Sequence, residues 1–315
     1  MLSILKLYIL LALLMVGCSN QPEEFCSYFN GWAMTMPYHI TVGKKVNREE
    51  HLLIQSIVQN TFQEIDQTVN NWNPNSELSS INQGLANIPH TTSIHLNHIL
   101  TLCNKITTLT DGRFDPTVAP LSKLWKNSLE RGEVPTITEL ENVRKSVGWN
   151  HIQLKDDEVW KDADGTSLDL CALSKGYCID LISERLKSAG FENLLVEWAG
   201  EIRALGKHPS GRNWTVQIEP SREQTFLING AIATSGDYLQ EWGQGYFHII
   251  DPKSGKPMMK KTGSIKATTV IAPTCIMADA LATSLMLFQT KEEAAIWGEA
   301  IVKEIPEVSF WIFTE

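Results

Sequence analysis

The stretch 168–180 reads LDLCALSKGYCID and joins an apolar, strand-like run to the beginning of a helix. Asp169 precedes the junction, and Lys175 and Gly176 occupy the predicted first turn of a helix that ends at Gly190. The free N–H groups of a helix N-terminus bind phosphate well, and a lysine there adds a full positive charge. The same pattern is also typical of an ordinary helix cap beside a solvated lysine, so the stretch alone leaves both interpretations open.

Hydrophobic spacing on both sides of this junction predicts helices and strands in irregular order. Apolar residues recur every three or four positions from Ile54 to Val69, and again in a helix that is capped by Ser93 and stops before Gly112. Thr138 and Glu141 suggest a capping box before another short helix. Strands are expected at 33–42, 194–198, 214–219, 231–235, 246–250, 267–272 and 308–313, and helices at 276–288 and 291–302.

The order of these elements decides the fold class. Helices and strands do not alternate strictly, which argues against a doubly wound parallel sheet. We therefore predict an α+β fold with mixed or antiparallel sheets flanked by helices. No linker divides the chain cleanly, and residues 32–315 are long enough for one large domain or two interleaved ones.

The first residues have the character of an export signal. Lys6 is the only charge before an apolar run from Leu7 to Val16, which is too short to span a bilayer and is followed by Gly17 and Cys18. We expect residues 1–17 to be a lipoprotein signal peptide, Cys18 to carry the lipid, and residues 18–31 to form a tether. An ordinary secretory signal or a short uncleaved anchor is the alternative.

Charge limits the classes of ligand. The 315 residues carry a net charge of −9, which argues against a nucleic-acid-binding surface. An anionic ligand would therefore need a local lysine, a helix N-terminus or a metal ion.

Other polar segments have ordinary interpretations when each is taken alone. Asp115 with Pro116 is typical of a turn, and Gly200 beside Glu201 is typical of a bulge or a close backbone approach. His248 opens the segment HIIDPKSGKP, but a single histidine is more often structural than catalytic. Asp279 and Thr283 lie one helical turn apart, so their oxygens could bind a hard cation or simply form a polar stripe.

The order and content of these segments together resemble the FAD:protein FMN transferase (ApbE-type) family from Ala33 to about Thr290. The resemblance rests on the segments MTMPYHI, WNPNSELSSIN, GRFDPTVAPLSKLW, LDLCALSKGYCID, EWAGEIRALG, ATSGDY, HIIDPKSGKP and TVIAPTCIMADALATSL.

The resemblance implies a Mg²⁺-dependent enzyme that splits FAD, transfers FMN to a Ser or Thr hydroxyl of a partner protein, and releases AMP. Acceptors in this family include subunits of membrane redox complexes such as the sodium-pumping NADH:quinone reductase. Many members are periplasmic lipoproteins, so we expect this chain to be lipid-anchored on the periplasmic side of the inner membrane. The alternatives are an FAD pyrophosphatase and a non-catalytic FAD-binding lipoprotein.

The resemblance also implies roles for particular residues. Those expected to contact FAD are Met34, Trp72, Arg113, Phe114, Asp115, Asp169, Lys175 and Ile250. Those expected to bind the metal are Asp279 and Thr283 through their side chains and Ala172 and Ala282 through their carbonyls. His248 is the candidate proton acceptor, and Asp279 is expected to act in catalysis by holding the metal.

Three departures from the family pattern bear on the reaction. The first segment reads MTMPY where the family prefers Met-Gly-Thr-Thr, and CALS replaces Gly-Gly-Ile-Ala before Lys175. Trp72 stands where the family often has a tyrosine, so the aromatic face is kept and the phenol hydroxyl is lost. These differences concern the balance between transfer of FMN and hydrolysis of FAD.

Overall fold

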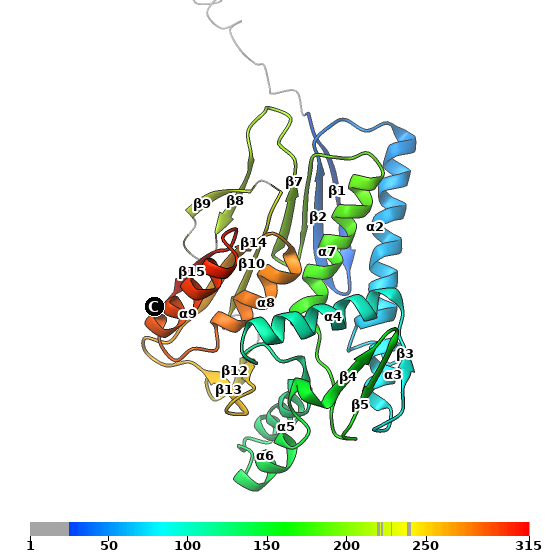
Figure 1. The fold of residues 1–315 in the computed structure, drawn as a ribbon. Coiled ribbons are helices and arrows are strands. Elements are labelled where there is room, and N and C mark those ends of the chain that lie inside the picture. Colours follow the sequence, from blue (N-terminus) through cyan, green and yellow to red (C-terminus); the bar gives the residue numbers. More distant parts are fainter. Residues whose placement is uncertain (1–24, 219–220, 222, 228, 238–240, 315) are drawn as a thin grey trace, which may run out of the picture.

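A seven-stranded antiparallel sheet forms the centre of the protein (Figure 1), in a computed structural model that describes residues 25–314 except 219–220, 222, 228 and 238–240. Its strand order is β1-β2-β6-β7-β10-β14-β15, and all the neighbouring strands are antiparallel. The strands are β1 (Ser27–Ala33), β2 (Met36–Val42), β6 (Leu194–Trp198), β7 (Glu201–Leu205), β10 (Ala231–Gly236), β14 (Ala267–Ala272) and β15 (Ser309–Phe313). The predicted α+β class with antiparallel sheets is confirmed.

The two faces of this sheet are covered differently. Helices pack on one face, as Figure 1 shows, namely α2 (Arg48–Val69), α4 (Ile94–Leu109), α7 (Cys171–Ser188), α8 (Cys275–Leu285) and α9 (Lys291–Glu304). The hairpin of β8 (Trp214–Ile218) and β9 (Glu223–Leu227) covers part of the other face. Neighbouring residues confirm this division, because Leu205 lies in the core beneath the helices and Ala204 in the cluster beneath the hairpin.

Smaller elements extend the domain beyond one end of the large sheet, at the bottom of Figure 1. Two three-stranded sheets contain β3 (His90–Thr91), β5 (Glu158–Lys161) and β4 (Ile152–Lys155), and β11 (Glu241–Gly243), β12 (Tyr246–Asp251) and β13 (Lys256–Met259). The short helices are α3 (Glu77–Gln83), α5 (Ala119–Glu130) and α6 (Ile137–Arg144), with 3-10 turns at Pro116–Val118 and Trp149–His151. Most of these elements are too short to show a periodic pattern from which they could be predicted.

Local sequence signals predict α2 and α4 correctly. The predicted apolar stripe of α2 is buried from Ile54 to Val69, and α4 begins after Ser93, whose hydroxyl accepts a hydrogen bond from the N–H of Leu96. The capping box of α6 was predicted two residues too late. Thr136 and Glu139 form it, not Thr138 and Glu141.

The beginning of the domain differs from the prediction. The tether expected through residue 31 is too long, because Ser27–Ala33 is strand β1, and the strand expected at 33–42 is the second half of a hairpin. Phe29 is buried opposite Ile40, so β1 is held by the core. Met34 and Thr35 form the two-residue turn with φ of 45° and 67°. The predicted signal peptide and Cys18 lie outside the described residues.

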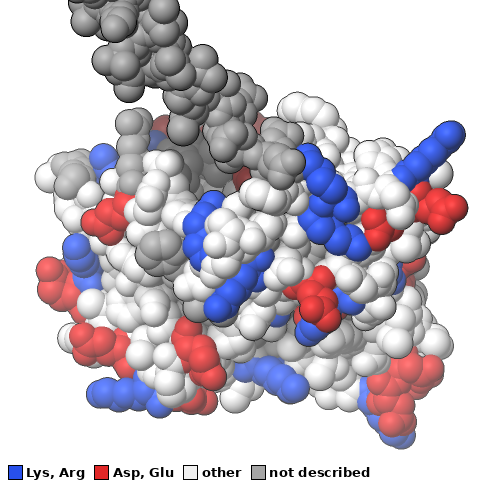
Figure 2. Space-filling model, turned by 90° about the horizontal axis from the view of Figure 1, so that it is seen from above, with Lys and Arg blue, Asp and Glu red and all other residues white. Residues whose placement is uncertain are grey.

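Two observations concern the surface of the described chain. None of its helices is both long and apolar enough to cross a bilayer. Figure 2 looks onto the end of the domain where β1 begins, and shows basic and acidic side chains interspersed on that face.

Helix α7 begins at Cys171, four residues before the predicted position, so Lys175 lies in its second turn. This places Gly176 against the beginning of α8, where a Cβ atom would come within 2.6 Å of the backbone of Cys275 and Ile276. Asp180, one turn further along α7, accepts hydrogen bonds from the N–H groups of Cys275 at 2.9 Å and Ile276 at 3.0 Å. The carboxylate of one helix thus caps the N-terminus of the other.

The close approach of these helices predicts the effect of Gly176→Ala. The methyl group would meet backbone, which cannot rotate away as a side chain can, so the helices must separate. We expect a loss of about 1–3 kcal/mol of unfolding free energy, measured by chemical denaturation. Ser174→Ala, on the same helix, is the control and should change stability little. An unchanged stability of Gly176→Ala would contradict the described contact.

Candidate functional site

Lys175 occupies the centre of a buried polar cluster between α7, α8 and β7. Its Nζ atom lies 3.0 Å from Oε1 of Glu201 and 3.4 Å from Oδ2 of Asp279. It also donates to the carbonyl of Cys171 at 3.3 Å. Glu201 and Asp279 are only 4% and 3% exposed. Lys175, predicted to contact FAD, and Asp279, predicted to bind the metal, are therefore in direct contact, in an environment largely shielded from water.

This burial changes the protonation of all three groups. Burial raises the pKa of Glu201 to about 8 and also raises the pKa of Asp279, although Lys175 lowers both. Burial disfavours the charged form of Lys175, but the carboxylates of Asp279 and Glu201 outweigh it and raise the pKa of the lysine. With both acids ionised, one positive charge faces two negative charges, so the cluster favours an additional cation.

Thr283 lies one turn beyond Asp279 on α8, as predicted, and its hydroxyl is 3.1 Å from the hydroxyl of Ser235 on β10. The backbone N–H of Gly176 lies close enough to Asp279 to lower the pKa of its carboxyl group. The carbonyl of Ala172 lies in the first turn of α7, and its oxygen has a second lone pair beyond the one that a helical hydrogen bond uses. A carboxylate, a hydroxyl and a carbonyl oxygen are ligands that suit Mg²⁺.

The carbonyl of Ala282 does not fit the predicted ligand set. It accepts a hydrogen bond from the hydroxyl of Thr268 at 2.6 Å and another from the N–H of Met286 at 3.3 Å. Both lone pairs of the oxygen are thus engaged within the buried part of α8. We therefore do not include Ala282 among the metal ligands. The sequence could not show this, because the second donor, Thr268, comes from β14.

Asp169 connects α7 to the turn that carries Trp72. Its Oδ1 atom accepts hydrogen bonds from the side chain of Asn71 at 3.0 Å and from the N–H of Cys171 at 2.9 Å. The indole of Trp72 is 79% exposed and lies beneath the ammonium of Lys126, 5.6 Å from the ring centroid. The two residues predicted to contact FAD therefore lie on adjoining loops, and Trp72 has a ring face open for stacking.

The segment 113–115 is built mainly into the protein. The guanidinium of Arg113 lies over the ring of Phe288 at 3.8 Å from its centroid, and Phe114 is buried in the main core. The carboxylate of Asp115 accepts hydrogen bonds from Thr117 and from the N–H of Trp149. Asp115 thus holds the turn together, which was the ordinary interpretation, and the side chain of Phe114 is unable to reach a ligand.

His248 and Ile250 lie on β12, which belongs to a different sheet from β7 and β10. The side chain of Ile250 is buried against Leu121 and Trp125, so only its backbone is available for the predicted contact with FAD. Met34 is partly buried in the turn between β1 and β2. The roles of His248 and Met34 remain predictions.

Comparison with known proteins agrees with this arrangement. The model of the ApbE family matches residues 34–304. A protein of Chlamydia pneumoniae named FAD:protein FMN transferase is 36% identical, covering 92% of this chain and 93% of its own. The chain belongs to the ApbE family.

Solved structures support the same assignment. The flavin transferase ApbE from Vibrio cholerae superposes with a TM-score of 0.77 at 29% identity, over 92% of this chain and 93% of that chain. The Pseudomonas stutzeri flavinyl transferase ApbE gives 0.81 at 26% identity, over 92% and 91%. The sheet order and the helix pair α7–α8 therefore belong to an ApbE fold.

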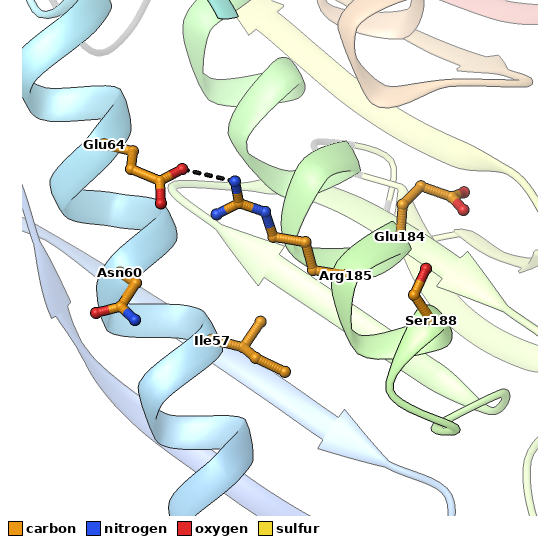
Figure 3. Close-up of a pocket in the computed structure, with 6 residues that line it drawn as sticks. All are labelled: Ile57, Asn60, Glu64, Glu184, Arg185 and Ser188. Carbon is orange, nitrogen blue, oxygen red and sulfur yellow. Dashed lines mark hydrogen bonds and ion pairs between the residues drawn. The ribbon is translucent and has the colours of Figure 1, made fainter.

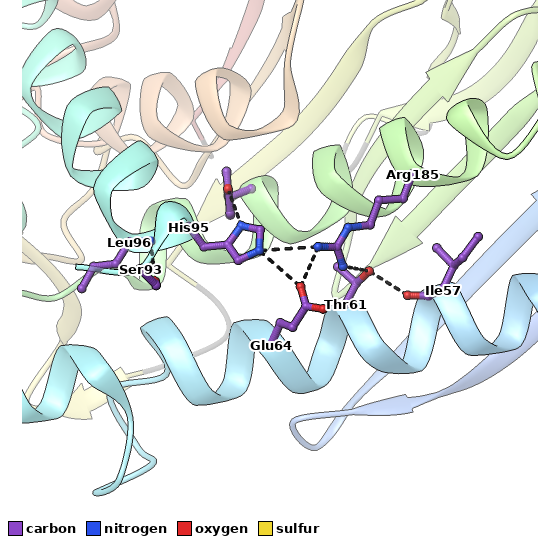
Figure 4. A network of polar contacts seen from close by, with 8 residues as sticks. Ile57, Thr61, Glu64, Ser93, His95, Leu96 and Arg185 are labelled. Atoms are coloured by element: carbon purple, nitrogen blue, oxygen red, sulfur yellow. Dashed lines mark hydrogen bonds and ion pairs between the residues drawn. The ribbon is translucent and has the colours of Figure 1, made fainter. Parts of the chain in front are cut away.

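A surface pocket of about 430 Å³ lies elsewhere, between α2 and the second half of α7 (Figure 3). It is lined by Ile57, Asn60, Glu64, Glu184, Arg185 and Ser188. Arg185 donates to Glu64 at 2.6 Å and to Thr61 at 2.9 Å, and His95 lies 3.2 Å from Glu64. Figure 4 shows how these side chains point toward one another. These contacts join α2, α4 and α7, so we interpret this polar network as structural rather than as part of the site around Lys175.

Glu201 is a member of the site for which no pattern in the sequence predicts a role. Gly200 beside it indicates a bulge or a close backbone approach, and an acidic residue at the start of a strand is usually solvated. The structure shows a two-residue turn at Ala199 and Gly200, with φ of 55° and 96°, and Trp198 paired with Glu201. The sequence signal that could have indicated a buried Glu201 is Trp198, a large aromatic residue on the other side of the turn. Directly opposed residues of a hairpin share a face, so a buried Trp198 implies a buried Glu201.

The raised pKa values of Glu201 and Asp279 predict a pH-dependent stability of the metal-free protein. Acids whose pKa is higher in the folded than in the unfolded state stabilise the fold when protonated, and this stabilisation is lost as the pH rises through the folded pKa. Unfolding free energy in EDTA should fall between pH 5 and 8, by up to about 1.4 kcal/mol per pH unit for one proton. Glu201→Gln should flatten this slope in denaturation experiments, and an unchanged slope would contradict the assignment.

Proposed function

We propose that this chain is a Mg²⁺-dependent FAD:protein FMN transferase. The observation that carries the proposal is the buried ion pair of Lys175 and Asp279, in a chain of the ApbE family whose relatives bear that enzyme name. Lys175 offers a cation to a pyrophosphate, and Asp169 and Trp72 lie on loops close to the same helix N-terminus. An acidic protein thereby gains one local site for an anionic substrate.

The residues that would hold Mg²⁺ are Asp279, Thr283 and the carbonyl of Ala172. When bound, the ion would neutralise charge on the pyrophosphate oxygens and make AMP a better leaving group. Asp279 and Thr283 are held at one turn's separation by the rigid helix α8, whose N-terminus is fixed by Asp180. The cluster's excess of negative charge supports the fit of a divalent cation at this place.

The proposed reaction joins the FMN half of FAD to a Ser or Thr of another protein. The acceptor hydroxyl oxygen forms a bond with the phosphorus on the FMN side, and the bond from that phosphorus to the bridging oxygen breaks, so AMP leaves. The hydroxyl proton passes to a base, for which we propose His248. The exposed face of Trp72 is available to stack on the flavin ring.

The resemblance to the family is also the basis on which we propose an acceptor and a location. We propose an exported protein anchored by a lipid on Cys18, facing the periplasm on the inner membrane, with an acceptor such as a subunit of a sodium-pumping NADH:quinone reductase. FAD and this acceptor are the proposed partners, and no nucleic acid is expected at a net charge of −9. Hydrolysis of FAD to FMN and AMP is the competing outcome, which the loss of a phenol at Trp72 favours.

Mass spectrometry of the acceptor tests the proposed activity. Incubation of the protein with FAD, Mg²⁺ and an acceptor domain should add one FMN to the acceptor and release AMP. Free FMN without that addition would identify a hydrolase, and FAD binding without turnover would identify a storage protein. Asp279→Asn should lower the transfer rate at least about 100-fold because a metal ligand loses its charge. Asp157→Asn, on an exposed turn, is the control.

The role of His248 has its own test. His248→Ala should lower the transfer rate by about 10²–10⁴-fold, since a positioned base contributes that much, while FAD binding followed by flavin fluorescence stays unchanged. The control is His39→Ala, whose ring lies on the exposed face of β2. Transfer at the rate of the unmodified protein would exclude His248 as the base.

A further inference from the structure

Glu201 has one carboxylate oxygen whose role the proposed reaction does not explain. Oε1 binds Lys175 at 3.0 Å, whereas Oε2 is buried and has no hydrogen-bond partner among the residues that the structure describes. The whole residue is 4% exposed. Because a buried carboxylate oxygen without a donor costs free energy, a ligand is expected to supply the missing contact.

The lysine beside it is unable to supply that contact. An ammonium group has three N–H donors. Those of Lys175 are directed at Oε1 of Glu201, Oδ2 of Asp279 and the carbonyl of Cys171, at 3.0, 3.4 and 3.3 Å. When Glu201 is ionised, its second oxygen therefore needs a donor or a positive charge from outside the protein.

The position of Glu201 is also rigid. It is the first residue of β7, directly after the two-residue turn at Ala199 and Gly200, and it is paired with the buried Trp198. A two-residue hairpin turn fixes the register of its strands, so the carboxylate has little freedom to reach water. Lys175 contacts both Glu201 and Asp279, which places the two carboxylates in one cluster.

We propose that Glu201 is a positioning residue of the divalent-cation site. Through Oε1 it holds Lys175 against Asp279, and through Oε2 it accepts a hydrogen bond from a water molecule on the cation. This inference rests on the proposed function, because that function places the cation at Asp279. It adds a residue that no oxygen-ligand pattern on α8 indicates, contributed by the central sheet.

Metal binding tests this role independently of turnover. Mn²⁺, which gives an electron paramagnetic resonance signal when free, is titrated into the full-length protein without FAD. Glu201→Gln keeps the size of the side chain and an oxygen for Lys175 but removes the charge, and it should weaken Mn²⁺ binding about 10–100-fold, as expected for a residue that holds metal-bound water. Glu197→Gln is the matched control, one residue before Trp198 on the opposite face of the same hairpin.

The outcomes separate the inference from the proposed function. Equal Mn²⁺ affinity in the unmodified protein and in Glu201→Gln, with weaker binding in Asp279→Asn, would overturn the role of Glu201 alone. Absence of Mn²⁺ binding to the unmodified protein, with or without FAD, would overturn the metal site and this inference together. If Glu201→Gln does not fold, Glu201→Asp is used, whose shorter carboxylate is unable to reach both Lys175 and the cation's water. Unchanged affinity there would overturn the proposal.

Discussion

The contact of Lys175 with two buried carboxylates is the constraint on which the arrangement of the domain depends. One ammonium group joins α7 to α8 through Asp279 and to the central sheet through Glu201. Charges out of water are costly unless they are paired closely, so the three elements must meet with little tolerance. The tight crossing at Gly176 and the capping of α8 by Asp180 supply that precision on either side of the lysine.

The site is therefore stabilised by packing that extends beyond its own residues. Asp180 also lies 3.6 Å from Arg203 on β7, and Arg203 donates to the carbonyl of Pro273, just before α8. A second buried lysine, Lys161 on β5, also joins separate segments of the chain. Lys161 is 3% exposed and donates to the carbonyls of Asn82 and Thr166 at 2.9 Å each, which fixes the loop leading to Asp169.

The long helices and several residues of the site could be predicted from the sequence, for identifiable physical reasons. Long amphipathic helices such as α2 have a strong periodic signal, and Asp279 with Thr283 share a face because helical spacing requires it. The beginning of α7 was placed too late because Lys175 and Gly176 were interpreted as an opening turn. In the structure they are explained by contacts with α8, more than ninety positions later in the chain. Glu201 and the occupied carbonyl of Ala282 likewise depend on partners that only tertiary structure brings together.

The length of the two-residue turn between β6 and β7 decides to which face of the sheet the side chain of Glu201 points. Side chains alternate between the faces of a strand, so moving the chain by one position turns every residue to the other side. Insertion of a single residue at Ala199 or Gly200 that shifts β7 by one position would direct Glu201 towards the face that the β8–β9 hairpin covers, and would leave Lys175 without this carboxylate. The length of this short loop thus determines whether a carboxylate reaches Lys175. Among related chains, we expect insertions and deletions in this loop to be tolerated poorly.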